Sequence, residues 1–95
     1  MPWPSKPLGS TVWSVARVSA KQDEAGQLAK LGHAIRTHRT ALGLSQEALA
    51  DAAGIDRSHM GRIERGQRNV TLLNLIRVAD ALHRKLSLIL ADADL

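Results

Sequence analysis

The stretch that decides the fold is residues 44–66, LSQEALADAAGIDRSHMGRIERG. Its pattern predicts two short helices joined by a tight turn, because apolar residues recur at helical spacing on both sides of that turn. The apolar residues that should sit where the two helices cross are Leu49, Ala50, Ile55, Met60 and Ile63. Gly43, Gly54 and Gly66 fall just past three successive predicted helix ends, where a left-handed residue is needed and glycine takes that conformation cheaply. The stretch therefore predicts a compact pair of crossing helices.

Further helices are predicted on both sides of this pair. A first amphipathic helix is indicated by an apolar stripe that ends before Gly43 and consists of Leu28, Leu31, Ile35, His38 and Leu42. It starts either at a capping box formed by Ser19 and Gln22 or nearer Asp23. Ser45, Asp56 and Thr71 suit the caps of the next three helices.

The second helix should run to about Ala53 and the third from Arg57 to about Arg65. The apolar set expected on the fourth helix is Leu72, Leu75, Ile76, Ala79 and Leu82. The following LSLIL segment, residues 86–90, suits a short fifth helix, and its alternating leucines leave a strand as the alternative.

The composition suits one small all-α domain. The chain has 95 residues, 44% of them hydrophobic, but only two aromatic residues. A core of Leu, Ile, Val and Ala favours interdigitated helices over a β-sandwich. We expect a compact four-to-five-helix domain over residues 23–90 and a C-terminal tail over 91–95. Residues 1–22, which hold all three prolines and a β-branched run, should form an irregular or short-strand N-terminal arm.

Several functional classes are disfavoured by the residues present. Cysteine is absent, which removes disulfides and thiolate metal sites. The four histidines have no metal-binding spacing, and Ser58 and His59 are helix neighbours whose side chains point apart, so no triad forms. We expect no cofactor, no metal and no enzymatic activity. No apolar run reaches the roughly 20 residues of a membrane span and no secretory signal is evident, so a cytoplasmic protein is expected.

Positive charge is concentrated on the second helix of the pair. The net charge is +4 and the isoelectric point about 10.4. Between residues 57 and 68 the only acid is Glu64, whereas the arginines are Arg57, Arg62, Arg65 and Arg68. On a helix, Met60 and Ile63 share the face opposite most of these arginines. An outward arginine face fits phosphates and base edges, and the helix pair has the size to lay one helix in the DNA major groove.

Residues 28–90 resemble the lambda-repressor-like helix-turn-helix family, also described as Cro/C1-type regulators. In the family's core, this chain has Gln46, Ala50, Gly54, Met60 and Ile63 at the constrained positions. The run IERGQRN followed by TLLNLIRVADAL also looks like the family's junction of the third and fourth helices. The resemblance implies a sequence-specific regulator of transcription, a repressor or autoregulator, that binds a palindromic operator in double-stranded DNA.

The resemblance also implies roles for individual residues. Those implied to contact bases are Gln46, Arg57, Ser58 and Arg62, the first of which matches a position that contacts backbone phosphate and sometimes a base. Those implied to contact phosphates are Arg36, His59, Arg65, Arg68 and Asn69. Arg39 and Glu64 match positions that form an ion pair between the first and third helices. That pair also has a physical reason, because Glu64 lies near the buried face and a charge there needs a partner.

Because one such domain buries little DNA surface, we expect a two-fold homodimer. Its contact is expected from the fourth helix and from Leu86, Leu88, Ile89 and Leu90, with the N-terminal arm as a further candidate. Within the regulator class, controller proteins of restriction–modification systems are similar in size and share a comparable IERGQRN-like stretch. The alternatives are a DNA-binding antitoxin with a toxin partner, in which residues 86–95, LSLILADADL, form a short dimerising strand, and a protein-bridging module without DNA contact.

Overall fold

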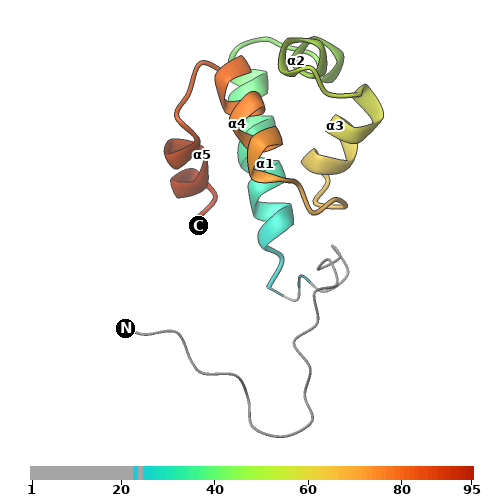
Figure 1. Cartoon of the computed structure of the whole chain (residues 1–95). Coiled ribbons are helices and arrows are strands. Elements are labelled where there is room, and N and C mark those ends of the chain that lie inside the picture. Colours follow the sequence, from blue (N-terminus) through green and yellow to red (C-terminus); the bar gives the residue numbers. More distant parts are fainter. Residues whose placement is uncertain (1–22, 24) are drawn as a thin grey trace, which may run out of the picture.

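Five helices make up the described part of the chain, and it contains no strand. The computed structural model describes residues 23 and 25–95 (Figure 1). Its helices are α1 (Gln27–Ala41), α2 (Gln46–Ala53), α3 (Arg57–Glu64), α4 (Leu72–Ala81) and α5 (Leu86–Asp92). The predicted all-α class is confirmed, and the LSLIL segment is helical. The N-terminal arm predicted for residues 1–22, with its capping box, lies outside the described residues.

Local hydrogen bonds start the helices where the sequence predicted. The side chains of Ser45 and Thr71 accept hydrogen bonds from backbone N–H groups three residues further on, at 3.0 and 3.2 Å. Of the two predicted starts for α1, the one nearer Asp23 is supported. The Asp23 carboxylate accepts from the N–H groups of Gln27 and Leu28 at 3.0 and 2.8 Å, at the first turn of α1.

The turn between α2 and α3 depends on a left-handed glycine. Gly54 has φ 69°, and the next residue, Ile55, donates its N–H back to the carbonyl of Ala50 at 2.9 Å. This closes the end of α2 while redirecting the chain into α3 within a few residues. Gly43 and Gly66 also have positive φ, so the three predicted helix ends are confirmed.

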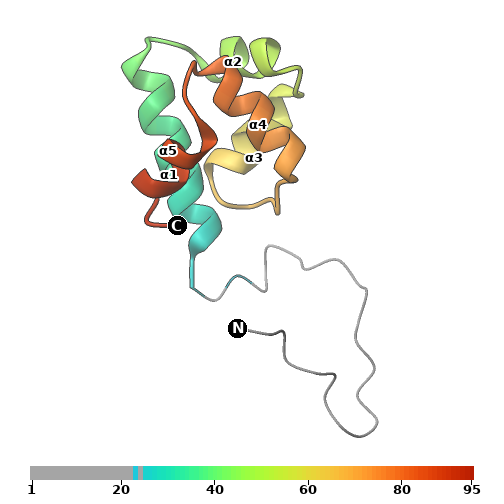
Figure 2. The ribbon, with the colours of Figure 1, turned by 60° about the vertical axis from the view of Figure 1, so that its left-hand side comes forward.

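The helices are arranged around α1. In Figure 1, α3 and α5 lie on opposite sides of α1, and both pack against it. α4 packs against α2 and α5 and completes the bundle (Figure 2). The helix pair predicted from residues 44–66 therefore packs against the rest of the bundle, with α3 against α1 and α2 against α4.

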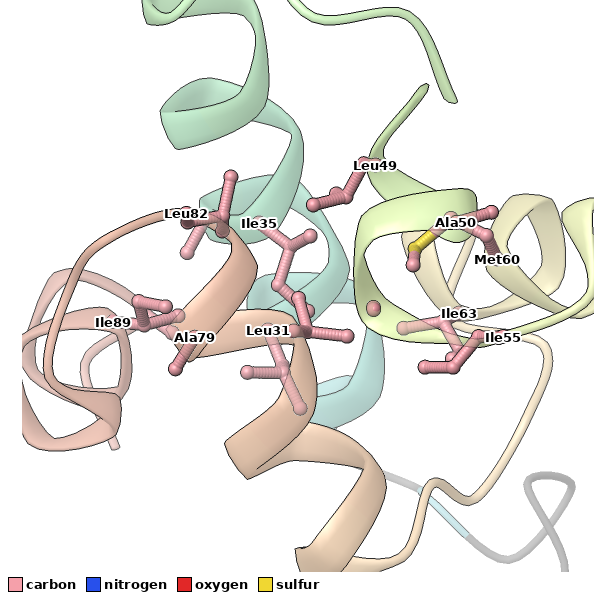
Figure 3. Close-up of a cluster of buried hydrophobic side chains, with 14 residues drawn as sticks. Leu31, Ile35, Leu49, Ala50, Ile55, Met60, Ile63, Ala79, Leu82 and Ile89 are labelled. Carbon is pink, nitrogen blue, oxygen red and sulfur yellow. The ribbon is translucent and has the colours of Figure 1, made fainter. Parts of the chain in front are cut away.

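A single apolar core joins all five helices. Figure 3 shows Leu31 and Ile35 of α1 near its centre, with Met60 of α3 and Ile89 of α5 entering from opposite sides. All five residues expected at the crossing of the helix pair are buried, which confirms that part of the prediction: Leu49, Ala50, Ile55, Met60 and Ile63.

Two sequence expectations were wrong. On α4 the buried stripe contains Val78, whereas Leu72 and Ile76 are 64% and 39% exposed. The stripe that faces the core follows the i, i+3, i+4, i+7 spacing that starts at Leu75, which leaves Leu72 and Ile76 to one side of it. The domain also continues past residue 90, since α5 ends at Asp92 and Ala93 is buried in the core.

Candidate nucleic-acid interface

The N-terminus of α3 is fixed by Asp56. Its carboxylate accepts hydrogen bonds from the backbone N–H of Ser58 at 3.0 Å and from the Ser58 hydroxyl. The Ser58 hydroxyl first, and then the backbone N–H groups of His59 and Ser58, hold the pKa of Asp56 below its ordinary value of 3.8. The cap is therefore charged at neutral pH. Because the Ser58 hydroxyl donates to Asp56, its oxygen remains available to a ligand as an acceptor.

The faces of α3 divide as the sequence predicted. Met60 and Ile63 are fully buried, at 0% and 2% exposure. The side chains of Arg57, Ser58 and Arg62 are exposed. The helix therefore turns its cationic and hydroxyl groups outward while its apolar groups fill the core.

A groove of about 360 Å³ runs between the start of α2 and the outer face of α3. Its lining residues are Gln46, Arg57, Ser58, Gly61, Arg62 and Arg65. All four residues predicted to contact bases therefore line the same groove, together with one predicted phosphate contact. The other predicted phosphate contacts lie outside it: Arg36, Arg68 and Asn69 are exposed and His59 is half-buried.

Arg39 and Glu64 form a bidentate ion pair beneath this groove. Arg39 Nε donates to Glu64 Oε2 at 2.7 Å, and Arg39 Nη2 donates to Oε1 at 3.0 Å. The Nη1 of Arg39 donates to the carbonyl of Leu44 at 2.8 Å. The side chains of Arg39 and Glu64 are only 11% and 2% exposed, so the predicted partners meet in a buried site. Gln46 joins them, since its Nε2 donates to Glu64 Oε1 at 3.0 Å.

Two glycines shape the site and were not predicted as part of it. A Cβ on Gly32 of α1 would stand 2.5 Å from the carbonyl oxygen of Ile63 and also against that of Glu64, so α1 and α3 touch backbone to backbone. A Cβ on Gly61 would stand 3.1 Å from Nη1 of Arg65, within the groove. The only sequence signal was a glycine inside a helical pattern, which often has a packing reason.

The residues predicted for a dimer contact are not equally accessible. Leu88 is 44% exposed, and Leu86 and Leu90 are half-buried. Ile89 is 1% exposed and fills the domain's own core, so its assignment to an intermolecular contact was wrong. A seven-residue helix with apolar side chains on every side gives no periodicity from which its buried face can be read.

The described residues contain no group of three or more potential metal ligands. None of the described helices is long and apolar enough to cross a membrane.

The chain belongs to the helix-turn-helix family, whose pattern its sequence matches over residues 35–89. This family consists of DNA-binding regulators of transcription and not of enzymes. The lambda-repressor-like resemblance stated from the sequence is thereby confirmed.

Similar proteins include a control protein and a hypothetical transcription factor. The control protein C.SmaI of Serratia marcescens is 45% identical over 53 residues, which are 56% of this chain and 63% of that protein. A hypothetical transcription factor of Neisseria meningitidis is 38% identical over 60 residues, 63% of this chain and 57% of the relative. The chain thus spans less than two thirds of either relative's length.

The match to one solved structure covers a larger share of both chains. The restriction-modification controller protein C.AhdI from Aeromonas hydrophila superposes with a TM-score of 0.67 and 48% sequence identity. The match covers 67% of this chain and 97% of C.AhdI.

Proposed function

We propose that this chain is a transcriptional regulator that binds specific sites in double-stranded DNA by laying α3 in the major groove. The observation that carries the proposal is the groove lined by Gln46, Arg57, Ser58 and Arg62 on the exposed side of α3. The major groove of DNA, about 12 Å wide, admits an α-helix, and its base edges present hydrogen-bonding groups that such side chains match. A module that only bridged proteins would have no need for this concentration of arginine.

The exposed side chains divide by chemistry into base readers and phosphate contacts. We assign Arg57 and Arg62 to base edges, because a guanidinium donates two hydrogen bonds to guanine O6 and N7. Gln46 and Ser58 complete the base-reading set. The residues assigned to phosphates are Arg36, His59, Arg65, Arg68 and Asn69. These contacts set affinity and position and carry little sequence information.

We propose further that the regulator acts as a homodimer. A single domain of this type buries only about 600–1,000 Å² on DNA, which limits its specificity. Leu73 on α4 is 70% exposed and Leu88 on α5 is 44% exposed, and α4 packs against α5. Leu72 and Ile76 add apolar surface on α4. In the proposed dimer these apolar residues meet about a two-fold axis, and the two α3 helices bind half-sites about 34 Å apart in a palindromic operator.

Among regulators, we propose a controller of restriction–modification genes that acts as a repressor or autoregulator. The support is the similarity to C.AhdI, which extends over nearly all of that controller protein. One feature of the antitoxin alternative was a dimerising strand in the LSLILADADL segment. Residues 86–92 of that segment are helical, so the described residues do not contain this strand.

Selection of bound fragments from random duplex DNA tests the proposal directly. We expect enrichment of a near-palindromic sequence and an affinity that falls steeply with salt. Arg62→Ala should then relax the preference at one or two base pairs of each half-site, at a cost of about 1–3 kcal/mol. Arg68→Ala should weaken binding to every sequence and reduce the salt slope by about one unit.

Arg77→Ala is the matched control, because it removes an exposed guanidinium that lines a different groove, between α2 and α4. It should leave sequence preference unchanged. If Arg62→Ala lowered affinity equally for all sequences, its assignment as a base reader would be wrong. If no duplex showed salt-sensitive binding, the proposed function itself would be wrong.

Sedimentation of the Leu73→Glu/Leu88→Glu double variant tests the dimer separately. We expect a folded monomer that still binds single half-sites weakly. An unchanged dimer in solution would place the contact on another face.

A further inference from the structure

The buried carboxylate of Glu64 determines which end of the Gln46 amide faces inward. Glu64 Oε1 accepts from Gln46 Nε2 at 3.0 Å and from Arg39 Nη2 at 3.0 Å. An ionised carboxylate only accepts hydrogen bonds, so the amide nitrogen of Gln46 can face it and the amide oxygen cannot. Arg39 is itself held by the carbonyl of Leu44, which keeps the carboxylate in place.

The other end of the same amide lies at the groove. Gln46 Oε1 is 3.5 Å from the point where a Cβ on Gly61 would stand, and both residues line the groove. Because Gly61 has no side chain, nothing from that position covers the oxygen. The groove therefore presents a fixed acceptor among the donors of Arg57, Arg62 and Arg65.

We propose that Glu64 is a positioning residue that holds Gln46 with its carbonyl oxygen toward the DNA, so that Gln46 selects a base with an exocyclic amino group. This inference rests on the proposed function and names the base class that one of its residues reads. In the major groove, adenine N6 and cytosine N4 are donors, whereas guanine O6 and thymine O4 are acceptors. The acceptor oxygen of Gln46 therefore favours adenine and cytosine and disfavours guanine and thymine.

We assign Gln46 to a base because a base can use both free groups of its amide, whereas a phosphate can use only the free N–H. A phosphate oxygen is an acceptor, so it gains nothing from the carbonyl end of the amide. Of the two N–H groups on Gln46 Nε2, one is already donated to Glu64. The remaining N–H can donate to adenine N7 while Oε1 accepts from adenine N6, which makes adenine the better of the two accepted bases.

Without the Glu64 carboxylate, the selectivity of Gln46 for one class of base should weaken. Rotation of a free amide by 180° exchanges its oxygen and nitrogen with almost no change in shape. A glutamine that is not held in one orientation therefore pairs equally well with donors and with acceptors. Glu64→Gln replaces the carboxylate by a group that has both a donor and an acceptor. Either orientation of Gln46 then finds a partner, and the discrimination should relax.

The test measures binding to the selected operator and to its single-base-pair variants. In the wild type, one position in each half-site should prefer adenine or cytosine over guanine or thymine by about tenfold. Gln46→Met keeps the length of the side chain, removes the amide and should abolish that preference. Gln27→Met, the same substitution at the exposed start of α1, should retain it. Glu64→Gln should reduce the preference at the same position, and Gln46→Met added to it should remove what remains.

The ratio of affinities is the decisive quantity. The charge change in Glu64→Gln alters binding to all sequences equally, so it cancels in the ratio, and circular dichroism at the assay temperature establishes that each variant is folded. The proposal is overturned if Gln46→Met weakens all sequences equally, as a phosphate contact would, or if its position selects guanine or thymine. If Glu64→Gln does not fold, Gln46→Met alone decides the base class. Failure of the wild type to select any sequence would instead contradict the proposed function.

Discussion

Removal of the Arg39 guanidinium should destabilise the domain far more than removal of any exposed arginine. Arg39 donates two hydrogen bonds to Glu64 and one to the carbonyl of Leu44, at 2.7, 3.0 and 2.8 Å. In Arg39→Ala, the Glu64 side chain, only 2% exposed, would keep Gln46 as its sole hydrogen-bond partner among those the structure shows. A buried charge left without its counter-charge costs about 3–5 kcal/mol.

The expected loss is large enough to measure without ambiguity. For a domain of this size, each kcal/mol lowers the melting temperature by roughly 4–8 °C, so Arg39→Ala should melt about 15–30 °C below the wild type. Thermal unfolding followed by circular dichroism at neutral pH is the assay. Arg36→Ala removes an exposed arginine from the same helix and should change stability by less than about 0.5 kcal/mol.

A compensating variant separates the lost charge pair from lost packing. In Arg39→Met/Glu64→Leu no lone charge remains, so most of the lost stability should return, as it does when buried ion pairs are replaced by apolar residues. The reasoning is refuted if Arg39→Ala melts within a few degrees of Arg36→Ala. It is also refuted if the double variant is no more stable than Arg39→Ala.

Two further predictions concern the close contact between α1 and α3 and the charged cap of α3. Gly32→Ala should cost about 1–3 kcal/mol in chemical unfolding despite a better helix propensity, because its Cβ would meet the carbonyl oxygens of Ile63 and Glu64. At Gly61→Ala the Cβ meets the flexible end of Arg65 and, at an ordinary van der Waals distance of 3.5 Å, Gln46 Oε1, so this variant should be neutral or stabilising. Equal effects of the two variants would contradict the close contact of α1 and α3. Hydrogen bonds lower the pKa of Asp56 below 3.8, so its cap contributes stability above that pH and loses it as the pH falls through the lowered pKa. The stability difference between wild type and Asp56→Asn should therefore be constant above about pH 5 and shrink under more acidic conditions, and a difference independent of pH would exclude a charged cap.

The features that were predictable from the sequence are those set by neighbours along the chain. Ser45, Asp56 and Thr71 cap helices through hydrogen bonds to residues two or three positions away, and such bonds need no tertiary structure. Gly54 ends α2 for an equally local reason. The division of α3 into a buried and an exposed face follows from its periodicity. These local rules were enough to place the predicted base-contacting residues on one surface.

The features that were missed depend on how the helices pack against one another. Val78 is buried and Leu72 is exposed because α4 contacts α2 and α5 along one particular stripe. Ile89 turns inward because α5 lies across α1, which its own sequence does not specify. The contact between Gln46 and Glu64 joins residues 18 positions apart, and it exists only because α2 and α3 cross at this point.

Two adjacent residues of α1, His38 and Arg39, contact the helices to which DNA binding and dimerisation are assigned. His38 Nε2 and Asp92 Oδ2 of α5 are 2.7 Å apart, while Arg39 binds Glu64 of α3. Successive side chains on a helix point about 100° apart, so one turn of α1 holds the base-reading helix on one side and the helix of the proposed dimer contact on the other (Figure 1). In the dimer we propose, α1 therefore joins α3 to the α5 part of the dimer face, while α4 joins α2 to the rest of that face. Loosening the His38–Asp92 contact should alter the spacing of half-sites that the dimer tolerates. It should leave base preference within each half-site intact, because Gln46 and the arginines are held by the other side of the same helix.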